Sequence, residues 1–296
     1  MIGRVTQTMT SDQLLGNVQR LQRRLLVAQD TLSSGKKLRQ ASDDPAGAAL
    51  VNGLRAQSAD LNSLSRTIGF GRSVLTAQDD ALGQAQDILV RAKEIASQQA
   101  GGLATATTRQ QAAEEVEALE RQLLTLGNTA IDGRHVFGGL ASGTAPFSDF
   151  DDPGFDPLNP YTGPSGSFSI RTAPGTTVRL TTPGDQVLGS SIAALDGLRQ
   201  TLVAGNSSTA SIDPLEAAAD GVRAERASVG GRARQLGDRA SEITSSVSKI
   251  TARLGDIESA DYATVITELT QLQTALQATL SAGQTLQTSI LDYLNL

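Results

Sequence analysis

The feature that most constrains this chain is a heptad repeat of apolar residues near both ends of the sequence. In each terminal segment the apolar residues recur at alternating steps of four and three. This spacing places two apolar residues in every seven on one narrow stripe of a helix, and a second helix must cover that stripe to remove it from water. Both ends of the chain are therefore predicted to form helices that need a partner.

The two apolar stripes are the candidate assembly interface. On the N-terminal side the stripe consists of Leu14, Val18, Leu21, Leu25 and Leu32, and on the C-terminal side of Val265, Leu269, Leu272, Leu276, Leu286 and Ile290. Residues 1–40 hold seven basic and two acidic side chains, whereas residues 256–296 hold five acidic side chains and no basic one. Because these charges attract each other, we expect the two terminal helices to pair. We also expect them to be largely disordered in the free monomer and to become ordered on assembly.

Between the ends, the same repeat predicts further long helices. The longest is expected from Asp44 to about Gln98, with the Asp44 carboxylate as its N-cap and Pro45 in the first helical position. At about 1.5 Å per residue this helix spans about 80 Å, which indicates an elongated molecule. Further helices are expected at residues 112–130, 192–204 and 262–294. Another helix is expected from Asp213-Pro214 onward, with the same cap chemistry as Asp44-Pro45. A hinge is expected at residues 255–261.

The composition changes abruptly in the middle of the chain. Residues 137–190 hold five of the six Phe, seven of the nine Pro and only two basic residues. Proline at this density excludes a helix there. Residues 167–171 and 176–180 alternate polar with apolar side chains on either side of a Pro-Gly turn, and this pattern predicts two short β-strands. We therefore expect a small β-rich insertion.

These elements predict a mainly α fold, an elongated rod of long N- and C-terminal heptad helices with a small central β-rich insertion domain. Three parts are expected. Residues 1–43 and 256–296 form the terminal coiled-coil assembly segments, residues 44–136 and 191–255 the helical rod, and residues 137–190 the insertion. A narrow aliphatic seam suits helical packing better than a broad enzyme core, because only 3% of the residues are aromatic.

Several classes of partner and cofactor are not expected. The net charge of −6 disfavours nucleic acid, which needs clustered basic side chains. The absence of cysteine removes thiolate metal sites and nucleophiles, and no apolar stretch is long enough for a membrane helix or for a cleavable signal peptide. The glycine pairs at 138–139 and 230–231 lack the strand before them and the Lys and Ser or Thr after them that a phosphate loop requires.

The candidate catalytic residues all have a simpler structural interpretation. His135 is the one histidine of the chain, and we interpret it as a loop residue at a domain junction. Asp43 and Asp44 resemble a carboxylate pair, but helix capping explains them. Asp151 and Asp152 are expected in a solvated turn. We therefore predict no catalytic, cofactor-binding or metal-binding residues and no enzymatic activity.

One segment resembles a known family. Residues 32–49, LSSGKKLRQASDDPAGAA, are similar to the N-terminal signature of flagellin-type proteins, and residues 226–232, RASVGGR, resemble the start of their C-terminal helical region. Proteins of this family have helical terminal segments that build a tubular core and a variable central insertion. The resemblance covers residues 1–147 and 190–296, and the insertion resembles nothing that we can name.

The family contains filament-forming flagellins and hook-associated junction proteins, and three segments resemble the junction proteins. They are residues 132–139 (DGRHVFGG), 144–147 (TAPF) and 289–294 (SILDYL). The Asp-Asp-Pro of residues 43–45 also suits a junction protein, although some flagellins share it. The resemblance thus implies a structural component of the bacterial flagellum that joins the hook side to the flagellin filament and is needed for motility.

The same resemblance implies partners and a location. The partners would be other copies of the chain in a ring, another hook-associated protein, flagellin and a flagellar export chaperone. Export would follow the flagellar type III route without a cleaved signal peptide, to the extracellular flagellum. Two alternatives stay open, a flagellin-like filament subunit and a cytosolic coiled-coil adaptor. An adaptor would have terminal helices that are stable in the monomer.

Overall fold

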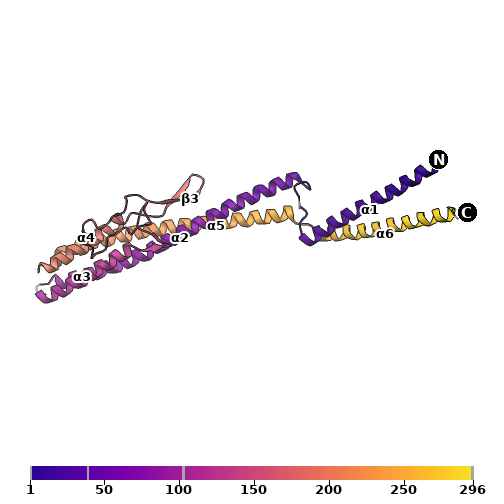
Figure 1. The fold of residues 1–296 in the computed structure, drawn as a ribbon. Helices are drawn as coiled ribbons and strands as arrows, with labels where there is room; N and C mark the ends of the chain where they lie inside the picture. Colours follow the sequence, from indigo (N-terminus) through magenta and orange to yellow (C-terminus); the bar gives the residue numbers. More distant parts are fainter. Residues whose placement is uncertain (1, 39, 102–103, 295–296) are drawn as a thin grey trace. The chain divides into compact units, whose positions relative to one another are not determined.

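The computed structural model describes the backbone of residues 2–38, 40–101 and 104–294, and the side chains of residue 9 and of residues 12–38, 40–101 and 104–285. This part of the chain is mainly α, with six α-helices and two short β-hairpins (Figure 1). The predicted mainly α class with a small β-containing insertion is confirmed. The chain forms two compact units, Met1–Ala59 with Val247–Leu296, and Asp60–Ser246. The predicted division of the chain into terminal segments, a helical rod and an insertion, with boundaries after residues 43, 136, 190 and 255, stays a prediction.

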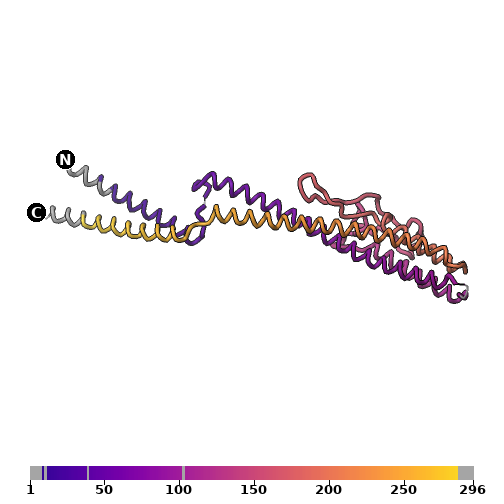
Figure 2. The backbone as a smooth tube through the Cα atoms, turned by 180° about the vertical axis from the view of Figure 1, so that it is seen from behind, coloured from indigo at the N-terminus to yellow at the C-terminus, as the bar shows by residue number. Residues whose placement is uncertain are grey.

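The first unit is built on the two terminal helices. Helix α1 (Ile2–Ser34) packs against helix α6 (Tyr262–Leu294), and the two lie side by side in both views (Figures 1 and 2). Their axes come close where Gly283 faces Leu14, since a Cβ added to this glycine would lie 3.0 Å from a Leu14 methyl group. The predicted pairing of the first and last helices is confirmed within one chain.

The base of this helix pair is a joint between two loops. The loop after α1 pairs with the segment before α6 through an antiparallel bridge between Lys36 and Ser259. The Ala260 amide donates to the Gly35 carbonyl at 2.9 Å, and Gly35 takes a φ of +68°, which glycine adopts without steric cost. Helix α5 (Ile212–Glu258) ends at this joint, and residues 259–261 separate it from α6. The predicted hinge at residues 255–261 therefore began too early, because residues 255–258 are helical.

The second unit has a helical core. It contains most of α2 (Pro45–Gln99) and α5, together with α3 (Ala106–Gly127), α4 (Gly184–Val203) and the 3-10 helix η1 (Ser208–Ser211). Helix α3 packs against α4. The buried residues of α2 and α5 include two series that recur at intervals of seven, as the heptads predict. They are Ile68, Leu75, Leu82 and Leu89 on α2, and Val222, Val229, Leu236 and Ile243 on α5.

Helix α2 begins as predicted, but α5 does not. The amide of Gly47 donates to the Asp44 carboxylate at 2.9 Å, and Pro45 is the first helical residue. Helix α5 was expected after an Asp213 cap, and this is wrong because η1 leads directly into it at Ile212. Pro214 then lies in the first turn, where its missing N–H breaks no helical hydrogen bond.

The end of α3 also differs from the prediction. The heptad was extended to Ala130, whereas the helix ends at Gly127 and Ala130 lies in strand β1 (Ala130–Ile131). Strand β1 pairs with β2 (Arg134–His135) in a hairpin that the sequence analysis did not predict. Its two turn residues both have positive φ, +49° at Asp132 and +74° at Gly133, as a tight two-residue hairpin turn requires.

The insertion contains the two predicted strands. Strands β3 (Ser169–Ala173) and β4 (Thr176–Arg179) form an antiparallel hairpin in which Ile170 faces Val178, and both side chains are buried. A helix was excluded from residues 137–190, and this is wrong after Pro183, where α4 begins at Gly184. Pro183 is the last proline of the insertion, so the sequence that follows it is free to be helical.

Candidate assembly interface

The predicted interface residues lie on the faces of α1 and α6 that approach each other. Leu272 is buried, and the other predicted residues with described side chains are half-buried, namely Leu14, Val18, Leu21, Leu25, Leu32, Val265, Leu269 and Leu276. The side chains of Leu286 and Ile290 lie outside the described residues. Within one chain, pairing of the two helices therefore already removes much of this stripe from water.

A second set of apolar side chains on the terminal helices faces solvent, and the sequence analysis missed it. Leu15, Leu26 and Val27 of α1 are 56–59% exposed, and Ile266 and Leu280 of α6 are about half exposed. Leu15 and Leu26 are eleven residues apart, close to three full helical turns, so they lie on one stripe. That spacing is visible in the sequence, but the stronger heptad of the inward stripe concealed it.

Charge contributes little to the pairing of the two terminal helices in one chain. Arg24 and Glu268 form the ion pair between α1 and α6, with 3.0 Å between the guanidinium and carboxylate. Both side chains are largely exposed, and an ion pair of this kind is worth about 0–1 kcal/mol. Arg20 and Arg23 form no ion pair with any residue that the structure describes. The charges of Arg20 and Arg23 are thus available to another molecule.

A groove runs along the surface of the terminal pair. It has a volume of about 220 Å³ and lies between the two helices, with Val27 and Ala28 on the α1 side and Val265 on the α6 side. Arg23 and Glu268 lie at its edges. The groove adjoins the outward apolar set, because Val27 belongs to both.

Glu258 holds the joint at the base of the terminal pair. Its carboxylate contacts the Lys36 ammonium at 3.0 Å and also the Arg55 guanidinium, and only 13% of its side chain is exposed. The hydrogen bond from Lys36 lowers the pKa of the Glu258 carboxyl, with Arg55 acting in the same direction. The loop between α1 and α2 and the turn between α5 and α6 are therefore tied together by one carboxylate.

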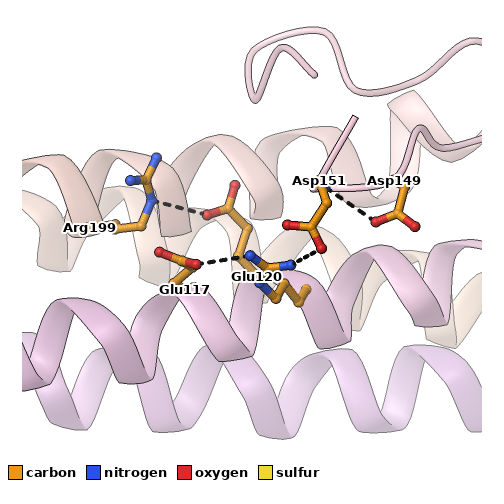
Figure 3. A network of polar contacts seen from close by, with 6 residues as sticks. Glu117, Glu120, Asp149, Asp151 and Arg199 are labelled. Atoms are coloured by element: carbon orange, nitrogen blue, oxygen red, sulfur yellow. Dashed lines mark hydrogen bonds and ion pairs between the residues drawn. The ribbon is translucent and has the colours of Figure 1, made fainter. Parts of the chain in front are cut away.

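A second carboxylate cluster lies between α3 and α4. Glu120 is fully buried, and Arg199 lies beside it (Figure 3). Asp196 is nearly fully buried and also pairs with Arg199. The Glu120 carboxylate is 3.4 Å from Arg199 Nε but forms no hydrogen bond with it. Burial raises the pKa of Glu120 to about 7, and the negative charge of Asp196 acts in the same direction. This cluster was not predicted, because a Glu within a helix is usually expected to be exposed.

The side chains considered for catalysis occupy structural positions. His135 Nδ1 is 2.8 Å from the Asn128 carbonyl at the β1–β2 hairpin, and Asp44 caps α2. Asp151 pairs with Arg121, 2.6 Å away, and its amide donates to the Asp149 carboxylate (Figure 3). The described residues contain no group of three or more His, Cys, Asp or Glu side chains arranged to bind a metal ion.

No helix within the described part of the chain is both long enough and apolar enough to cross a membrane. The terminal helices pair through one apolar stripe and leave other apolar side chains exposed, a pattern typical of the class of helical proteins that associate through their ends.

Comparison with known proteins identifies the family within this class. Residues 5–142 match the family model of the bacterial flagellin N-terminal helical region, and residues 212–294 match that of the bacterial flagellin C-terminal helical region. Together the two models span most of the chain. This chain therefore belongs to the bacterial flagellin family.

Curated relatives match only part of this chain. Flagellin A of Vibrio anguillarum is 35% identical over 116 residues, which cover 39% of this chain and 31% of the relative. A flagellin of Listeria monocytogenes is 31% identical over 102 residues, which cover 34% of this chain and 36% of the relative. The match thus spans about a third of the length of these relatives.

Solved structures share the fold over a larger share of the chain. A structure described as a flagellar hook-associated protein of Vibrio parahaemolyticus has a TM-score of 0.65 and 17% identity, and covers 73% of this chain and 100% of that one. Bacillus cereus FlgL has a TM-score of 0.60 and 18% identity, and covers 69% of this chain and 99% of that one. At these identities the likeness establishes a common fold.

Proposed function

We propose that this chain is a structural subunit of the bacterial flagellum that acts at the junction between hook and filament. One observation carries the proposal: the flagellin helical regions at both ends are joined to a small insertion in a fold shared with structures described as a hook-associated protein and as FlgL. Segments 132–139, 144–147 and 289–294, which resemble junction proteins, support the same role.

The proposed mechanism assigns different tasks to the two apolar stripes of the terminal helices. The inward stripe, represented by Leu21 and Leu272, holds α1 and α6 together in one subunit. The outward stripe, represented by Leu15, Leu26 and Ile266, packs against terminal helices of neighbouring subunits. Because the outward side chains are about half exposed or more, the terminal pair alone leaves a large part of its apolar surface in contact with water. We propose that it becomes fully ordered only in the assembly.

The proposed partners follow from this role. They are further copies of the chain in a ring, another hook-associated protein on the hook side, flagellin on the filament side, and a chaperone during export. We propose export by the flagellar type III route without a cleaved signal peptide, and an extracellular location in the flagellum. We also propose that the chain has no enzymatic activity, in keeping with the structural positions of His135, Asp44 and Asp151.

A flagellin-like filament subunit is the second candidate, because the curated relatives are flagellins. Seeded growth separates the two roles. Purified chain is mixed with hook fragments or with short filament seeds, and the ends are observed by electron microscopy. A junction protein adds a band of limited length to the ends, whereas continued growth of a homopolymer would overturn the junction role and support the filament role. A cytosolic adaptor would attach to neither seed.

A further inference from the structure

A pocket lies between helix α2, residues 134–136 and the insertion. The pocket has a volume of about 140 Å³ and is lined mainly by apolar side chains, among them Phe70, Val74 and Leu180. Two of the lining side chains remain exposed to solvent, Leu140 by 64% and Phe168 by 39%. A mostly apolar pocket holds water poorly, because water needs two or more polar partners. The pocket therefore suits an apolar side chain from another molecule.

The same unit presents an apolar side chain of matching character. Leu158 is 72% exposed, which is the largest exposed fraction of any large hydrophobic side chain among the described residues. Asp156 holds the backbone at Leu158, because its carboxylate accepts from the Leu158 amide and from Asn159 Nδ2, each at 3.0 Å. A loop backbone that is ordered before contact lowers the entropy cost of binding.

The loop that carries Leu158 is anchored to its own helix α3. Arg121 of α3 pairs with Asp151 at 2.6 Å and lies over the Phe150 ring, 4.2 Å from its centroid. Phe150 in turn contacts the ring of Phe155, with 5.0 Å between the centroids. The loop is thus an ordered projection of the insertion, with Leu158 directed to solvent.

The loop and the region of the pocket carry opposite charges. Asp149, Asp152 and Asp156 of the loop form no ion pair with any described residue. The same holds for Arg134, which lines the pocket, and for Arg171 and Arg179, which lie on the β3–β4 hairpin between the lining residues Phe168 and Leu180. The Arg134 guanidinium lies over Phe70 at 5.8 Å from the ring centroid, and Arg171 and Arg179 are exposed. Complementary potentials of this kind select a partner and set its register.

We propose that Leu158 of one copy inserts into the Phe70 pocket of a second copy, with the acidic loop facing Arg134, Arg171 and Arg179. This inference rests on the proposed function, since it supplies a contact between copies outside the terminal helices. Loop and pocket are different surfaces of the chain, so the contact is heterologous and repeats from copy to copy. Such a contact builds a closed ring or a helical array and not an isolated dimer.

Site-directed cross-linking tests the contact, since the chain contains no cysteine. A Leu158→Cys variant is mixed with a Leu140→Cys variant at high concentration under mild oxidation, and the disulfide heterodimer is measured over time. The control mixes Leu158→Cys with Val203→Cys, because Val203 is 58% exposed but lies at the end of α4. The proposal predicts a rate at least about tenfold above the control, because docking raises the effective thiol concentration. Equal rates in the two mixtures would overturn it.

Reversing the charge of one residue on each surface provides a second test of the contact. An Asp152→Arg change in the Leu158→Cys protein should slow cross-linking severalfold, and an Arg171→Asp change in the Leu140→Cys protein should restore it, because attraction is re-established with reversed sign. A slowed rate that Arg171→Asp does not restore contradicts the assigned orientation. If Leu140→Cys cross-links to another flagellar protein and not to Leu158→Cys, the occupant is not a second copy and the inference fails.

The same variants separate this inference from the junction role. Attachment of the uncross-linked proteins to hook ends is measured in parallel. Attachment without preferential cross-linking disproves the contact and leaves the junction role intact. Preferential cross-linking without attachment supports the contact and contradicts the junction role.

Discussion

At the scale of single residues, the most unusual group is the buried carboxyl of Glu120. It shares the space between α3 and α4 with Asp196 and Arg199, and Glu117 also acts on it from the same helix. Two carboxylates and one guanidinium leave an excess negative charge when both acids are ionised, and a buried excess charge is costly. Protonation of Glu120 removes that excess.

This arrangement predicts a specific pH dependence of stability. The folded pKa of Glu120, about 7, lies above its usual value of 4.5, so the folded state binds the proton more tightly than the unfolded state does. The contribution of Glu120 is therefore fully present below about pH 4.5 and is lost as pH rises from 4.5 to 7. A Glu120→Gln variant keeps the shape without the charge and should be more stable than the parent at pH 8, by about 2 kcal/mol.

Urea unfolding of the Asp60–Ser246 unit at pH 5 and pH 8 checks this prediction, followed by a probe on α3 or α4. The parent should lose stability between the two pH values, and the Glu120→Gln variant should lose less. Equal losses in the two proteins would show that Glu120 is not the titrating group.

At the scale of elements, glycine residues of α2 show where the insertion packs on the rod. A Cβ at Gly71 would lie 2.8 Å from Ile170 of β3 and 3.1 Å from both Leu180 and Leu236. The β3–β4 hairpin and α5 thus approach the α2 backbone at a point where a side chain has no room. At Gly69, two residues earlier, a Cβ would meet no atom within 4 Å.

These two positions form a matched pair for a mutational test. Gly71→Ala should destabilise the protein by about 1–3 kcal/mol through overpacking, despite the better helix propensity of alanine. Gly69→Ala should stabilise it by up to about 1 kcal/mol, because only the helix propensity changes. Thermal unfolding of both variants measures the difference. A stabilised Gly71→Ala protein would show that the hairpin does not pack on α2 as described.

The helices were predictable from sequence because their cores repeat every seven residues. Leu75 and Leu82 of α2 are fully buried at the positions that the heptad assigns to the core. The β1–β2 hairpin was not predicted, because the heptad was extended to Ala130, although the Asp132-Gly133 pair that follows favours a tight turn. Burial of Glu120 was missed because an ionisable side chain is expected to be exposed, although its spacing of four from Val116 and three from Leu123 places it on the buried face of α3.

Of the candidate interface, the inward stripe could be predicted from the sequence and the outward stripe could not. The heptad identified the stripe that joins α1 to α6, including Leu21 and Leu272. The outward stripe of Leu15, Leu26 and Ile266 has no strong period of its own, and only the pairing of the helices shows which apolar side chains remain exposed. A sequence pattern predicts that a helix needs a partner, whereas the structure shows what is left after the first partner is in place.

At the scale of the whole molecule, the account predicts that the terminal helices are the least protected part of the free chain. Helices α1 and α6 bury one stripe between them and leave apolar side chains exposed on the other side. Hydrogen exchange of the monomer should therefore be fast in residues 1–33 and 262–294 and slow in α2 to α5. After attachment to hook ends the terminal segments should become protected. Strong protection of both segments in the monomer would contradict the prediction and favour a cytosolic adaptor.

The central claim is that the outward stripe of the terminal pair attaches this subunit to the end of a flagellar structure. Attachment of labelled protein to isolated hook ends tests it most directly, with a Leu26→Asp variant compared with a Val203→Asp control. Leu26 and Val203 are 59% and 58% exposed, so each change should affect folding of the free chain little. The account predicts that Leu26→Asp reduces attachment at least about tenfold while Val203→Asp binds as the parent does. Undiminished attachment of Leu26→Asp would contradict it.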